Sequence, residues 1–92
     1  MTLEPVIVLR SRLIQPERLA SFVADCLRDR VELIAIWGVG CEALEDQIDD
    51  LVLASGGFIA TSSHPDETLE DVTNFAACHF SDRTGGFQIV DL

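Results

Sequence analysis

Residues 32–61, ELIAIWGVGCEALEDQIDDLVLASGGFIAT, contain two apolar runs on either side of an amphipathic segment. The first run, Glu32 to Trp37, is rich in aliphatic residues and predicts a buried strand. From Cys41 to Ser55 the apolar residues recur with the period of an α-helix. Gly56–Gly57 ends this helix, and residues 58–61 predict a second strand. The stretch therefore predicts a strand–helix–strand unit.

The rest of the chain repeats this alternation. Residues 5–9, PVIVL, predict a strand, and Pro16 fits the first turn of the helix that follows. Another helix begins after Pro65, and residues 87–90 predict a last strand. Apolar residues line one face of each outer helix: Leu19, Phe22, Val23, Cys26 and Leu27 in the first, and Leu69, Val72, Phe75 and Ala76 in the last. The predicted order is βαβαβαβ in a single domain, residues 1–92.

Strands that alternate with helices predict a three-layer α/β fold, in which helices cover both faces of a four-stranded, mostly parallel sheet. We expect the strand order 2-1-3-4, with the first helix on one face and the other two on the opposite face. The segment SDRTGG, residues 81–86, also permits an antiparallel last strand. Ligands of such sheets bind at the carboxyl ends of the strands, so the pocket is expected at that edge.

The composition limits the possible partners. The 92 residues include 16 acidic and six basic ones, and the net charge is −10. All six bases are arginines, and residues 31–82 contain none of them. Nucleic acid is not an expected partner, because phosphate binding needs a basic surface. The apolar runs are too short to cross a membrane, and three cysteines without CxxC spacing predict a cytoplasmic protein with reduced thiols.

The predicted helix at residues 41–55 has an unusual polar face. Its carboxylates fall opposite the core positions, and one apolar residue lies among them: Glu42, Glu45, Asp46, Asp49, Asp50 and Leu53. The helix dipole stabilises carboxylates only in the first turn, whereas each like-charged pair four residues apart destabilises a helix by about 0.2–0.5 kcal/mol. The face is either a solvated surface, which includes adaptation to high salt, or a binding face for a basic protein.

A second set of residues is expected at the strand ends: Arg12, Trp37, Cys41, Ser62, His64 and Asp66. Cys41 at a helix N-terminus and His64 at the next strand end suggest a Cys–His nucleophile. A structural role for Cys41 is favoured, because cysteines are commonly buried and the adjacent Glu42 opposes ionisation of the thiol. His64, Asp66 and Glu67 lie too close together in sequence to specify a metal site, and no cofactor is expected.

The stretches LIAIWGVGCEALEDQIDD and FIATSSHPDETLEDVTNFA resemble a small uncharacterised bacterial domain family of unknown function. In that family a strand ending in Trp-Gly leads to a Cys and an acidic helix, and another strand ends in a Thr-Ser/Thr-x-His motif. The matching positions within residues 33–92 are Trp37, Gly38, Cys41, Asp46, Thr61, His64, Asp66 and Glu67. Gly40 and Ser63 replace the Asp and Trp of the family pattern. The resemblance implies an α/β fold and no particular reaction.

These observations favour an acidic, non-enzymatic protein-binding module. We expect an inhibitor, immunity or antitoxin type of protein that binds a basic partner through its carboxylate face. The alternative is a small-molecule-binding or enzymatic α/β domain with a pocket around Trp37, Cys41 and His64. The oligomeric state is left open by the sequence.

Overall fold

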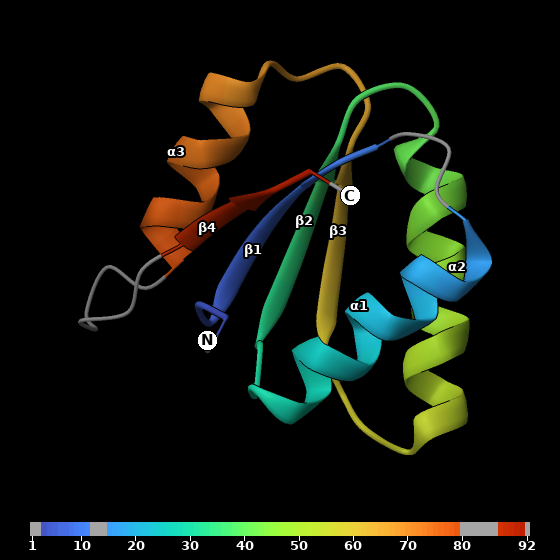
Figure 1. Cartoon of the computed structure of the whole chain (residues 1–92). Coiled ribbons are helices and arrows are strands. Elements are labelled where there is room, and N and C mark those ends of the chain that lie inside the picture. Colours follow the sequence, from blue (N-terminus) through green and yellow to red (C-terminus); the bar gives the residue numbers. More distant parts are fainter. Residues whose placement is uncertain (1–2, 12–14, 80–86, 92) are drawn as a thin grey trace.

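Seven elements alternate along the chain in the computed structural model, which describes residues 3–11, 15–79 and 87–91 (Figure 1). They are β1 Val6–Arg10, α1 Pro16–Arg28, β2 Leu33–Trp37, α2 Cys41–Ser55, β3 Ala60–His64, α3 Leu69–His79 and β4 Phe87–Val90. The predicted α/β class and βαβαβαβ order are confirmed. None of the helices in these described ranges is long and apolar enough to cross a membrane.

The four strands form one parallel sheet in the order β3-β2-β1-β4. The expected order 2-1-3-4 is wrong. The chain adds β2 and then β3 on the same side of β1, and only β4 pairs with the other side of β1. Both orders satisfy the same hydropathy pattern, because β1 is buried between two neighbours in either one. β4 also runs parallel to β1, so the antiparallel alternative is not realised.

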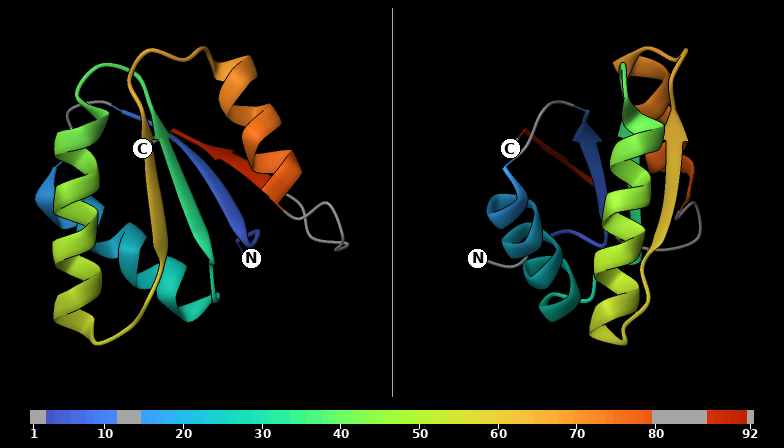
Figure 2. Two further views of the ribbon diagram at one scale, coloured as in Figure 1. Left: turned by 180° about the vertical axis from the view of Figure 1, so that it is seen from behind. Right: turned by 90° about the vertical axis from the view of Figure 1, so that its right-hand side faces the viewer.

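Helices α1 and α2 cover one face of the sheet and α3 covers the other (Figure 2). The expected separation of α1 from α2 is therefore wrong. The face that a right-handed crossover helix covers depends on the direction in which the chain moves across the sheet. The first two crossovers move the same way, whereas the third returns past β2 and β1, which places α3 on the opposite face.

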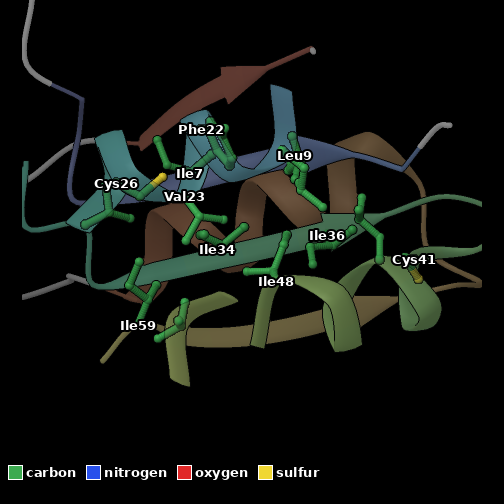
Figure 3. Close-up of a cluster of buried hydrophobic side chains, with 14 residues drawn as sticks. Ile7, Leu9, Phe22, Val23, Cys26, Ile34, Ile36, Cys41, Ile48 and Ile59 are labelled. Atoms are coloured by element: carbon green, nitrogen blue, oxygen red, sulfur yellow. The ribbon is translucent and has the colours of Figure 1, made fainter. Parts of the chain in front are cut away.

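Alternate residues of the central strands point into two separate apolar cores. The core beneath α1 and α2 is the larger (Figure 3), and it contains Ile7, Leu9, Leu19, Phe22, Val23, Cys26, Val31, Ile34, Ile36, Cys41, Leu44, Ile48, Val52 and Ile59. The core beneath α3 consists of Val6, Val8, Leu33, Ala35, Val72 and Ala76. The two cores show which face of the sheet each buried residue of β1 and β2 points to. The register with β2 then assigns each residue of β3 to a face as well.

The strand predicted at residues 58–61 has the wrong bounds, because β3 runs from Ala60 to His64. Its register pairs Ala60 with Leu33 and His64 with Trp37. Backbone pairing with β2 extends the strand into polar residues, and the side chains of β3 tolerate this because they are only half-buried at the sheet edge. Ser62 and His64 follow the end of the predicted strand, where a loop to the next helix is expected, but they belong to β3.

The loop between β2 and α2 is held by Ser11, the residue after β1. The Ser11 amide donates to the Trp37 carbonyl oxygen at 2.8 Å, and the Ser11 hydroxyl donates to the Val39 carbonyl oxygen at 2.8 Å. The backbone adopts φ values of 103° at Gly38 and 81° at Gly40, which favour glycine. Both glycines are therefore needed to turn the chain from β2 into α2.

The end of α1 is tied to the N-terminal segment through Asp29. The Leu3 amide donates to Asp29 Oδ2 at 3.0 Å, and Arg28 Nε donates to Asp29 Oδ1 at 3.2 Å. These bonds, the one from Leu3 first, lower the pKa of the Asp29 carboxyl. One turn earlier, burial raises the pKa of the Cys26 thiol to about 12, and the charges of Asp25 and Asp29 add to this rise.

Candidate functional site

The carboxylates of α2 form two rows instead of one continuous stripe. Glu42, Asp46 and Asp50 are exposed, and they follow one another at intervals of four residues. Leu53 continues this line in the last turn and is 75% exposed. We call these four residues the outer row. Side chains four residues apart on a helix are neighbours, so the outer row presents three carboxylates and one apolar group on a single line.

The inner row consists of Glu45 and Asp49, which are half-buried between α2 and β3. Thr61 Oγ1 lies 2.9 Å from Glu45 Oε2 and 2.8 Å from Asp49 Oδ1. The Thr61 hydroxyl has one hydrogen and donates to one of the two carboxylates at a time. The inner row therefore attaches α2 to the edge strand, and the structure separates these two residues from the surface formed by the outer row.

The outer row has no ionic partner within residues 3–11, 15–79 and 87–91. Ion pairs found in these ranges include those of Arg28 with Asp25 and Asp29 and of His64 with Glu67, and none of them involves the outer row. Exposed apolar side chains lie near both ends of α2: Val39 before its first turn is 94% exposed, and Phe58 after its last turn is 84% exposed. Carboxylates without an ion pair among the described residues are therefore flanked along the chain, at each end of α2, by an exposed apolar side chain.

A hollow of about 460 Å³ adjoins the start of the outer row. Its lining includes Glu42 and Asp46 on one side and Pro65 on the other. The carboxylates give this hollow a negative potential that favours a cationic side chain.

The Cys41–His64 pair, which the sequence suggested but did not favour, is not formed among the described residues. Cys41 has no exposed surface and packs in the core beneath α1 and α2. The His64 ring instead contacts Phe75 of α3, with ring centroids 4.9 Å apart. Their contacts lie on opposite faces of the sheet, so Cys41 acts as a core residue at the start of α2.

His64 is held between a hydroxyl and a carboxylate. Ser62 Oγ lies 2.9 Å from His64 Nε2, and Glu67 Oε2 forms a short contact with His64 Nδ1. A carboxylate only accepts hydrogen bonds, so in the neutral ring Nδ1 carries the hydrogen and donates it to Glu67. Nε2 then accepts the hydrogen of the Ser62 hydroxyl. The three residues form a continuous chain of hydrogen bonds from hydroxyl to imidazole to carboxylate.

Sequence reasoning placed Ser62 and His64 in the candidate pocket but not Glu67. The signal for Glu67 was its spacing, because Ser62-x-His64-x-x-Glu67 puts two side chains on the same side of a strand and a carboxylate one turn later. The preference for a loop at residues 62–66 concealed this pattern, since only an extended strand aligns Ser62 with His64.

The other predicted strand-end residues have different surroundings. Trp37 is half-buried beside His64 in the parallel register, and the Arg10 guanidinium lies 5.9 Å from the centre of its ring. The Trp37 indole N–H is buried and has no acceptor among the described residues. Asp66 is exposed, and Arg12 lies outside the described residues. In the part of the chain that the structure describes, no group of three or more His, Cys, Asp or Glu residues could hold a metal ion.

The geometry defines a small three-layer α/β protein with an acidic helix and a polar edge strand. The chain belongs to the family defined as a domain of unknown function, DUF7684, whose model matches residues 2–88. Comparisons with curated proteins and with solved structures found no match.

Proposed function

We propose that this protein is an acidic protein-binding module that binds a basic partner through the outer row of α2, as an inhibitor, immunity or antitoxin type of protein does. The observation that carries the proposal is the line of Glu42, Asp46, Asp50 and Leu53, which is exposed and forms no ion pair with the described residues. A cytoplasmic location is part of the proposal, and so is a bacterial source, which the resemblance to a bacterial family supports.

The energetics of α2 support a role for the outer row beyond solvation. The pairs Glu42/Asp46 and Asp46/Asp50 each destabilise the helix by about 0.2–0.5 kcal/mol, and Asp50 lies beyond the reach of the dipole at the helix N-terminus. A basic partner removes this repulsion when it binds. Complementary charge also accelerates encounter, and an apolar residue next to the charges supplies contact area that excludes water.

The hollow beside the outer row suggests how the partner is held. An Arg or Lys side chain of the partner fits between Pro65 and the carboxylates of Glu42 and Asp46. Leu53 is about two turns further along the helix and contacts an apolar surface of the same partner. The partner is therefore expected to present a basic side chain and an apolar patch in a line.

The test begins with capture of a partner from the host lysate by the wild-type protein at low and at high salt. The decisive comparison uses the variant E42Q/D46N/D50N, which removes three negative charges from the outer row. We expect the association rate of the purified partner with this variant to fall at least tenfold at low salt, since steering by exposed charges sets that rate.

A matched control removes three negative charges elsewhere. The variant D66N/E70Q/D71N changes the net charge equally, and its three substituted residues are exposed around the start of α3. It should bind the partner at nearly the wild-type rate. If both variants lose the same amount of affinity, net charge alone explains binding, and if neither does, the outer row is only a solvated surface.

A further inference from the structure

We propose that Ser62, His64 and Glu67 form a second site, which hydrolyses carboxylic esters with Ser62 as the nucleophile. The catalytic residues, Ser62 and His64, lie on the α3 side of β3, whereas the outer row lies on α2 across the sheet edge. The inference is independent of the proposed binding function, and either one can fail alone.

The atoms are arranged as nucleophilic catalysis requires. An alcohol is a weak nucleophile until a base removes its hydrogen, and His64 Nε2 lies 2.9 Å from Ser62 Oγ, within reach of that hydrogen. Glu67 binds the opposite ring nitrogen, which fixes the tautomer with a bare Nε2 and stabilises the positive charge that the ring acquires. Glu67 is a positioning residue, because it acts only through His64.

The imidazole is also fixed by packing. The side chain of His64 is only 11% exposed, and Phe75 covers its ring at a tilt of 55°. Ser62 and His64 are two residues apart on a strand paired with β2, so the backbone sets the spacing of their side chains. A nucleophile and a base on one rigid element keep their mutual geometry better than residues on separate loops.

Ester hydrolysis at this site has two stages, transfer of the acyl group to Ser62 and its release by water. Ser62 Oγ bonds to the ester carbonyl carbon while its hydrogen passes to His64 Nε2. The bond from the carbonyl carbon to the alkoxide then breaks, and the alkoxide leaves with the hydrogen from Nε2 as an alcohol. Water attacks the acyl group on Ser62, gives one hydrogen to Nε2, and that hydrogen returns to Ser62 Oγ as the carboxylic acid departs.

The surroundings restrict the class of substrate. Asp66 and Glu70 are exposed near the site, and the net charge of −10 repels anions. Phe75 is partly exposed beside His64, which provides an apolar contact for an acyl or aryl group. The substrates are therefore uncharged or cationic esters, and phosphate esters are excluded.

The first experiment measures hydrolysis of p-nitrophenyl acetate and labelling by a fluorophosphonate, with mass spectrometry of the labelled peptide. Wild-type protein should carry the label on Ser62, and S62A should lose the label and at least 90% of the hydrolysis, or about tenfold or more. The matched control is S63A, because Ser63 pairs with Ile36 and points to the opposite face of β3. S63A should keep the wild-type rate.

The second experiment tests the positioning role of Glu67. E67Q should lower kcat with little change in KM, and E67D should recover part of kcat because it restores a carboxylate. Circular dichroism confirms that each variant is folded. The inference is overturned if S62A hydrolyses the ester as fast as S63A, or if the label lies on another residue in wild-type protein.

Discussion

The effect of charge repulsion in the outer row on protein stability can be measured most directly at Asp46. It is exposed in the middle of α2 and stands four residues from both Glu42 and Asp50. Substitution D46K removes two like-charged pairs and creates two opposite-charged pairs. Each of these four changes stabilises the helix by about 0.2–0.5 kcal/mol. The sum is about 1–2 kcal/mol of added stability at low salt. For a domain of this size about 1 kcal/mol raises Tm by roughly 4–8 °C.

Thermal unfolding of wild-type, D46N and D46K proteins in about 20 mM and about 1 M salt measures this effect. D46N removes the repulsion without adding attraction, so its Tm should lie between the other two. In high salt the three values should converge to within the small difference in helix propensity. A D46K protein that melts at or below the wild-type temperature in low salt would refute the reasoning, because Asp46 would then have a stabilising partner.

Three further predictions concern the fold. Substitution T61V removes the hydroxyl that binds the inner row, and it should lower the free energy of unfolding by about 1 kcal/mol. T61S keeps a hydroxyl and should retain most of this stability. Equal denaturation midpoints for the T61V and wild-type proteins would contradict the role of the hydroxyl. Gly56 ends α2 at φ 78°, and no atom lies near an added Cβ. G56A should therefore lower the free energy of unfolding by about 1 kcal/mol through backbone strain alone, and G56N should lower it less. A G56A protein as stable as wild type would show that the chain does not need this conformation. Burial raises the pKa of Cys26 to about 12. The buried thiol therefore stabilises the fold fully below the unfolded pKa of about 8.5, and this stabilisation declines as pH rises toward 12. The chain contains no lysine or tyrosine, so the free energy of unfolding measured in urea between about pH 8 and 11 changes mainly through ionisation of thiols. If the C26A variant shows the same change with pH as the wild type, the change comes from other groups.

Local sequence determined the elements and most of the core. The period of Leu44, Ile48 and Val52 set the buried side of α2, and the glycines on either side set its bounds at Cys41 and Ser55. These features depend on neighbouring residues in the chain and on the conformational freedom of glycine, so they are readable without tertiary structure.

The candidate site shows where local sequence is insufficient. Hydropathy places Glu45 and Asp49 with the other acids of α2, but the hydroxyl of Thr61 on β3 separates them from the outer row. The hydrogen bonds of His64 to Ser62 and Glu67 arise because β3 extends to His64.

The tertiary structure alone decided the order β3-β2-β1-β4 and the face that each helix covers. Both follow from the direction in which each crossover moves along the sheet, and that direction leaves no trace in the hydropathy of a strand buried on both sides. The same topology put β3 at an edge, where pairing with β2 imposes an extended backbone on the polar sequence ATSSH. The sequence by itself determined which residues are apolar, acidic or nucleophilic, and long-range backbone pairing decided which of them meet.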